Sequence, residues 1–234
     1  MRQAARIFKK EFKSYFISPI AYIVISIFLL VTGWFFFGTF FIYNQASLRG
    51  FFSLLPLIFS FVVPAITMRL FSEELNVGSY ETLLTMPVTF IDVVVGKFLA
   101  SVAFIAAMLV PTLAYPIIIS FLGEMDWGPV IGGYVGAILL GAAFSAVGLF
   151  ASSLTRNQII AFIIGIAICF SLTILDNMLF FLPSSLLGVF GYIGADAHFQ
   201  TVSKGVLDSR DILYFLSISF IGLYATNLAM QEKK

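Results

Sequence analysis

Long stretches without a charged residue constrain this chain more than any other feature of its sequence. A helix that crosses the hydrocarbon layer of a membrane, about 30 Å thick, needs roughly 20 mostly apolar residues. Seven uncharged runs reach or approach this length: Ser14–Leu48, Gly50–Met68, Phe98–Gly123, Trp127–Thr155, Asn157–Leu175, Asn177–Ala195 and Ile212–Gln231. Only 11% of the residues are charged, against about 25% in soluble domains. The sequence therefore predicts an all-α integral membrane protein, with residues 1–234 forming one transmembrane domain.

Six regions are predicted to span the membrane: Ile20–Tyr43, Phe51–Met68, Val93–Leu122, Pro129–Leu154, Ile159–Leu175 and Ile212–Met230. Prolines inside the second and third spans predict bends, because each removes a backbone hydrogen bond. Gly132 and Gly136 form a GxxxG motif in the fourth span. Small residues let helices approach closely, and we expect ordinary packing within the bundle here rather than a dedicated dimer face.

The run 177–195 is interrupted by proline and glycine, so we expect short, partly buried helices that do not cross. It would belong to an extracytoplasmic segment over residues 176–210. An external gate or docking site is one interpretation of its apolar side chains, and a lid that only packs on the bundle is the other. The candidate gate or dock residues are Phe180, Phe181, Pro183, Leu187 and Phe190. Nearby, Asp196 and His198 are expected to form a solvated turn, and Asp208 or Ser209 to cap the last span.

Residues 2–16 predict an amphipathic helix lying in the membrane interface. Ala5, Phe8, Phe12 and Tyr15 share one face, and basic residues occupy the others, where they can contact anionic headgroups. The basic residues also set orientation. The apolar run that follows is too long for the core of a cleavable signal peptide.

Basic residues predict that the N-terminus lies in the cytoplasm, and six spans, which follow from the helix breakers in 177–195, then place the C-terminus there as well. With the N-terminus inside, ten lysines and arginines lie on the cytoplasmic side and three outside. Cytoplasmic loops carry this excess in membrane proteins. The score is the same whether or not 177–195 crosses, so charge cannot decide that question. We expect a multi-pass protein of the bacterial inner membrane.

One charged stretch, Arg69–Asp92, interrupts the apolar pattern with five charged residues. We expect a cytoplasmic loop from Phe71 to Asp92, in which Gly78 ends the preceding helix. A short helix over residues 79–87 would follow, with Thr89 and Asp92 capping the third span. So short a helix is marginal alone in water, and its Tyr-Leu-Leu ridge suits a groove on a partner or the underside of its own bundle.

Several other classes of function find little support in the residues. Cys169 and His198 are the only cysteine and histidine, which disfavours metal, redox and hydrolase sites. The P-loop pattern G-x-x-x-x-G-K-[ST] does not occur, so ATP hydrolysis would need another chain. Spans nearly devoid of charge argue against an ion-coupled secondary transporter, although sodium sites built from backbone carbonyls stay open. Lys97, one turn inside the third span, is expected to snorkel outward.

The stretch "MRLFSEELNVGSYETLLTMPVTFIDVVVGKFLAS" resembles the signature region of ABC-2-type ABC transporter permeases. Other runs, including "FFSLLPLIFSFVVPAITMR" and "GGYVGAILLGAAFSAVGLFASSLTRNQIIAF", are similar to the gliding-motility-associated branch. The similar regions cover most of the chain in the same order. Leu75 and Ser79 depart from the family pattern, since many relatives carry a basic residue and threonine there.

The resemblance implies a permease subunit that is expected to export its substrate and to pair with a second copy or a related permease. Each permease would rest on a cytoplasmic ABC ATPase, which would hold ATP and magnesium. The coupling helix 79–87 and the turn Thr155–Gln158 would contact that ATPase. The implied coupling residues are Glu73, Glu74, Gly78, Ser79, Tyr80, Glu81, Leu83, Leu84, Pro87, Thr155, Arg156 and Asn157. The gliding-associated branch also implies a membrane partner with a large external domain. A structural anchor in an envelope complex is the remaining alternative, and the substrate is not readable.

Overall fold

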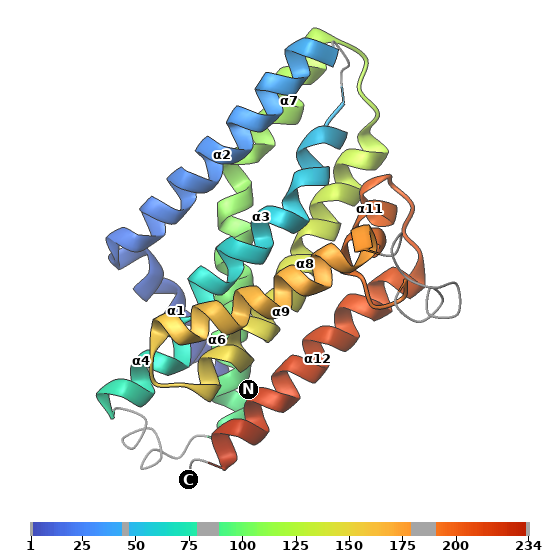
Figure 1. Cartoon of the computed structure of the whole chain (residues 1–234). Coiled ribbons are helices and arrows are strands. Elements are labelled where there is room, and N and C mark those ends of the chain that lie inside the picture. The colour runs from blue at the N-terminus through green and yellow to red at the C-terminus, as the bar shows by residue number, and fades with distance from the viewer. Residues whose placement is uncertain (1, 44–46, 79–88, 179–190, 233–234) are drawn as a thin grey trace.

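A computed structural model describes residues 2–43, 47–78, 89–178 and 191–232, and helices make up nearly all of them (Figure 1). In chain order these are α1 (Arg2–Ile17), α2 (Pro19–Tyr43), α3 (Arg49–Thr67), α4 (Arg69–Val77), α6 (Phe90–Leu109), the 3₁₀ turn η1 (Val110–Leu113), α7 (Ala114–Leu122), α8 (Trp127–Leu154), α9 (Gln158–Met178), α11 (Ala195–Ser203) and α12 (Ser209–Gln231).

Six helical segments among the described residues are long and apolar enough to cross a membrane. They are Pro19–Gly38, Arg49–Val77, Phe90–Leu122, Trp127–Leu154, Gln158–Asp176 and Ser209–Gln231. The prediction of an all-α protein with six candidate spans is therefore confirmed. Helix α4 lies at the lower end of the bundle in Figure 1, and the markers of both chain ends lie toward the same end. We call this end of the bundle the α4 end, and the end that carries α11 the α11 end.

Helix α8 is the central element, because it contacts α3, α4, α6, α9, α11 and α12. Its small residues make this possible. A side chain at Gly133 would collide with the ring of Phe52, and one at Gly136 would press on Val202 and Phe199. The GxxxG segment therefore packs against helices of its own chain, as predicted.

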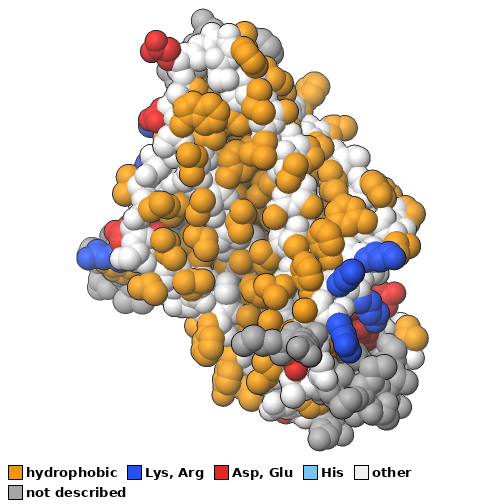
Figure 2. All heavy atoms as spheres, turned by 180° about the vertical axis from the view of Figure 1, so that it is seen from behind, with side chains coloured by type: hydrophobic (Ala, Val, Ile, Leu, Met, Phe, Trp, Pro, Cys, Tyr) orange, Lys and Arg blue, Asp and Glu red, His pale blue; other side chains and the backbone are white. Residues whose placement is uncertain are grey.

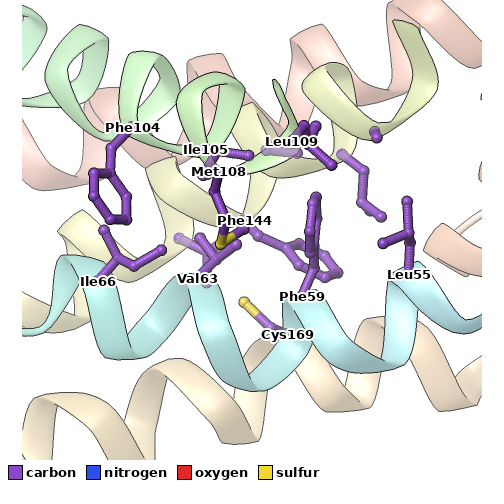
Figure 3. Close-up of a cluster of buried hydrophobic side chains, with 14 of the residues drawn as sticks. Leu55, Phe59, Val63, Ile66, Phe104, Ile105, Met108, Leu109, Phe144 and Cys169 are labelled. Atoms are coloured by element: carbon purple, nitrogen blue, oxygen red, sulfur yellow. The ribbon is translucent and has the colours of Figure 1, made fainter. Parts of the chain in front are cut away.

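The core lies between α3, α6 and α8, with α9 closing one side (Figure 3). The close-up shows side chains from α3 facing those from α6, with one residue from α8 and one from α9 between them: Leu55, Phe59, Val63, Ile66, Phe104, Ile105, Met108, Leu109, Phe144 and Cys169. Outside this core, apolar side chains are spread over the face shown in Figure 2, and many large hydrophobic side chains are exposed. An apolar surface of this extent suits hydrocarbon rather than water.

The two proline-containing spans behave differently. Helix α3 continues through Pro56 and Pro64, whereas α6 gives way at Pro111 to the 3₁₀ turn before α7. At this break the Tyr134 hydroxyl of α8 donates to the Thr112 carbonyl oxygen at 2.9 Å. A neighbouring helix therefore satisfies a backbone group at the interruption, as a membrane interior requires.

The contact between α8 and α3 leads to a test of the packing. Any side chain at Gly148 would overlap Thr67, whose hydroxyl donates to the Val63 carbonyl oxygen at 2.9 Å. We expect Gly148→Leu to lower the free energy of unfolding by about 2–3 kcal/mol through overpacking. Thermal unfolding of the purified protein in detergent measures the loss. Gly38→Leu is the matched control, because nothing lies within 4 Å of that position. Equal melting of the two variants would contradict the packing described here.

Candidate functional site

Helix α4 forms the first part of the charged stretch, because residues 69–77 are helical up to the predicted helix end at Gly78. Its amphipathic pattern explains this, since Leu70, Phe71 and Leu75 are buried against the bundle. The helix ends at Gly78, which has a left-handed φ of 75°. Glycine adopts this conformation without strain, so the predicted helix end at Gly78 is confirmed.

The junction between α3 and α4 is held by Ser152 of α8. The Ser152 hydroxyl accepts hydrogen bonds from the backbone N–H groups of Phe71 and Ser72, each at 3.0 Å, and donates to the Met68 carbonyl oxygen at 2.6 Å. The first N–H groups of a helix lack partners within the helix. Ser152 supplies them from a neighbouring helix, and so fixes α4 on α8.

Lys97 of α6 lies inside the structure, so the expectation that it snorkels outward is wrong. Its side chain is 2% exposed, and its Nζ lies 2.7 Å from Glu74 Oε1 and 2.7 Å from the Leu70 carbonyl oxygen. Glu11 Oε1 of α1 is 3.5 Å away. These acceptors replace the water that snorkelling would have supplied, because a buried charge needs paired partners.

Helix α1 packs along α6. A Cβ at Gly96 would lie 2.9 Å from the Ala4 carbonyl oxygen, so the two backbones are in close contact. The Tyr15 hydroxyl donates to the Ile66 carbonyl oxygen at 3.2 Å, and burial raises the pKa of this tyrosine, with Arg69 opposing the rise. Ala4, not Ala5, is the buried alanine, which corrects the predicted apolar face. On the face shown in Figure 2, a group of Lys and Arg side chains lies on one side, and further basic side chains lie on the opposite side.

The turn between α8 and α9 lies beside the end of α4. A cleft of about 410 Å³ is lined by Asn76 of α4 and by Arg156, Asn157, Gln158 and Ile159 of the turn. The turn holds itself with short-range bonds, because Thr155 Oγ1 accepts from the Asn157 N–H and Asn157 Oδ1 from the Ile159 N–H. Arg156 is exposed, so its guanidinium can meet a partner.

The predicted cap of the third span is confirmed. Thr89 Oγ1 accepts from the Asp92 N–H at 3.2 Å and donates to Asp92 Oδ2 at 2.7 Å. Residues 79–88, which separate α4 from α6, lie outside the described residues. The chain therefore leaves the α4 end at Gly78, beside the cleft, and returns to it at Thr89.

The structure separates the predicted coupling residues into three groups. Glu73 is exposed at the α4 end, whereas the neighbouring Glu74 faces Lys97. Thr155 and Asn157 shape the turn. Gly78 ends α4, and Arg156 is exposed in the turn. The other predicted coupling residues lie outside the described part: Ser79, Tyr80, Glu81, Leu83, Leu84 and Pro87. Leu75, one of the two departures from the family pattern, is buried at 8% exposure and packs in the hydrophobic core.

At the α11 end, the prediction of a solvated turn at Asp196 and His198 is wrong, because both residues lie in α11. His198 Nδ1 is 2.6 Å from Asp211 Oδ1 of α12, and its ring stacks on Tyr214 at 4.1 Å between centroids. Asp176 of α9 accepts from the Ala197 N–H at 2.8 Å. Burial raises the pKa of Asp196; the Gln200 hydrogen bond lowers it, and nearby Asp176 raises it.

The rest of the α11 end meets the predictions in part. Asp208 caps α12 by accepting from the Arg210 N–H at 3.0 Å, as predicted. The candidate gate or dock residues Phe180, Phe181, Pro183, Leu187 and Phe190 all lie outside the described residues. Contacts made by α9, α11 and α12 therefore define this end of the bundle.

Sequence reasoning missed Ser152 and Glu11 as parts of the α4 end. A serine in an apolar helix gives no local signal, since its hydroxyl usually bonds to its own helix. Glu11 offered a weak one, because it is the only acidic residue among the first 72. The single carboxylate within the basic helix α1 and the single lysine inside the third span could together have suggested that Glu11 and Lys97 are partners.

Removal of the Ser152 hydroxyl tests how α4 is held. Ser152→Ala leaves two N–H groups and one carbonyl without this partner, so we expect the free energy of unfolding to fall by about 3 kcal/mol. Ser101→Ala is the matched control: this serine is also buried, but its hydroxyl donates to Phe98 of its own helix. Thermal unfolding in detergent compares the two. A Ser152 variant as stable as the Ser101 variant would contradict the role of this hydroxyl.

The comparisons with known proteins agree with this architecture. No curated protein matches the chain. The sequence model of a family described as "ABC-2 family transporter protein" matches residues 5–194. The match includes α1, the α4 end and the turn between α8 and α9, and it covers most of the chain. This multi-pass membrane protein therefore belongs to the ABC-2 transporter family and is a membrane component of that family rather than its ATPase.

Proposed function

We propose that this chain is the transmembrane permease subunit of an ATP-driven exporter and that its α4 end binds the ATPase. Membership of the family implies an ATPase partner. The observation that carries the location is the cleft at Asn76 and Arg156. It lies where α4 ends and the α8–α9 turn begins, so two segments far apart in the sequence present one surface.

The chemistry of this surface suits a soluble partner better than lipid. Glu73, Asn76, Arg156 and Asn157 are exposed polar residues at the α4 end. Exposed Val77 and Ile159, at 73% and 68%, lie beside them. A mixture of polar and apolar groups is typical of protein interfaces. In our proposal residues 79–87 form the coupling helix and fill a groove on the ATPase.

The remaining parts of the assembly follow from the same proposal. The α4 end faces the cytoplasm of a bacterial inner membrane, because the excess of basic residues lies there. ATP and magnesium bind to the ATPase, since the sequence of this chain contains no P-loop. A second copy of the chain, or a related permease, completes a conduit that alternates between two states.

The α11 end is our proposed exit side. The resemblance to gliding-associated permeases suggests a companion with a large external domain, and the segment 176–210 would then act as its dock or as a gate. The hydrogen bonds that join α11 to α9 and to α12 support this, since they hold part of that segment on the bundle. A purely structural anchor in an envelope complex would need no ATPase, so the experiment below separates the two functions.

Co-purification of the ATPase tests the proposal, with Leu84→Arg as the variant. A charge in the apolar ridge should abolish binding to a groove, because an unpaired charge is costly to bury, while the membrane bundle stays folded. Leu207→Arg is the matched control, since Leu207 is 57% exposed near the α11 end. We expect wild type and Leu207→Arg to retain the ATPase and Leu84→Arg to lose it. Undiminished binding by Leu84→Arg, or no ATPase with wild type, would contradict the proposal.

A further inference from the structure

Lys97 lies where three helices of the α4 end meet. Its ammonium group contacts Glu74 and the Leu70 carbonyl oxygen of α4, each at 2.7 Å, and Glu11 of α1 at 3.5 Å. The ring of Phe71 lies 5.1 Å from the same nitrogen. Lysine can donate three hydrogen bonds, and three oxygen acceptors are present. One side chain of α6 therefore holds both α4 and α1.

A buried ion pair is an expensive way to join helices. Taking two charges out of water costs several kcal/mol per ion, and apolar pairs of similar volume often stabilise a fold as well or better. The rest of the core joins α3, α6 and α8 with such apolar contacts. Stability alone therefore does not explain why the α4 end contains the Lys97–Glu74 pair.

The position of the pair in the chain supplies that reason. Helix α4 directly precedes residues 79–88, and α6 directly follows them. Glu74 lies four positions before Gly78, and Lys97 lies eight positions after Thr89. The pair thus joins the two helices that flank the segment that binds the ATPase in our proposed function. This ion pair between α4 and α6 makes the two helices move together when the segment is displaced.

We propose that Lys97 is a positioning residue for energy coupling, which transmits displacement of the ATPase-bound segment to α6 and α1. This inference rests on the proposed function. Ser152 holds only the start of α4 on α8, so α4 can pivot about that point while Glu74, further along the helix, pulls α6 relative to α8. Without the ion pair, α4 still pivots about Ser152, but α6 no longer follows it.

The test measures movement of α6 against α8 in the complete complex. Spin labels are placed at Leu99→Cys and Leu154→Cys, both 45% exposed, and Cys169, the only native cysteine, is buried at 0% exposure. Their distance is measured by pulsed electron resonance without nucleotide and after trapping with ATP and vanadate. Dilution of labelled chains with unlabelled chains removes distances between two copies. In wild type we expect trapping to shift the distance by about 2 Å, the scale of helix shifts.

The decisive variant is Lys97→Met with Glu74→Leu. This apolar pair avoids a buried unpaired charge, and Glu11 keeps Lys10, whose Nζ lies 3.9 Å from its Oε1. We expect wild-type melting and full retention of the ATPase, but no distance shift. Lys97→Met alone should melt earlier, because Glu74 loses its cation. Lys13→Met, on the exposed face of α1, is the matched control and should shift as wild type does.

Each result has a separate meaning. A normal shift in the apolar pair would overturn the role of Lys97 while leaving the proposed function intact. No shift in wild type, with the ATPase bound, would also overturn it, since α6 would not move against α8. Loss of the ATPase from the apolar pair would make Lys97 part of binding rather than of transmission, which contradicts the inference. Failure of wild type to retain any ATPase would instead contradict the proposed function itself.

Discussion

Backbone hydrogen bonding within a membrane is the constraint on which this structure depends. A helix in hydrocarbon must satisfy its own N–H and carbonyl groups, so every interruption needs a partner from elsewhere. Two interruptions obtain theirs from α8: Ser152 bonds to the junction between α3 and α4, and Tyr134 bonds to the turn at Pro111. Helix α8 therefore supplies hydrogen bonds as well as packing. Its central position follows from both.

The small residues of α8 explain how one helix can serve so many neighbours. Glycine at 133, 136 and 148 brings other helices close enough for short side chains to reach their backbones. Among the described residues, the ion pairs between helices lie at the two ends of the bundle. At the α4 end an ion pair joins α1, α4 and α6, and at the α11 end His198 and Asp211 join α11 to α12. Because α8 contacts elements of both ends, it is the physical connection between them.

Local patterns predicted the spans and several of their ends. Apolar length identified the six membrane segments, and short-range chemistry identified Gly78 as a helix end and Thr89 and Asp208 as caps. The failures concern partners distant in sequence. Lys97 seemed free to snorkel because Glu74 and Glu11 lie 23 and 86 positions away. His198 seemed solvated because Asp211 belongs to another helix. Apolar periodicity says which face is buried, but it does not say which charge will be found there.

Glu73 and Glu74 are neighbours in sequence, yet their side chains lie in different environments. Glu74 is paired with a lysine of its own chain, whereas Glu73 is exposed at the α4 end. A change at Glu74 can therefore be compensated by a second change at Lys97 within the same gene. In our proposal a partner contacts Glu73, so a change there can be compensated only in the gene for that partner. Among diverging relatives, residue 74 would then change together with residue 97 of the same chain, whereas residue 73 would change together with residues of the partner chain.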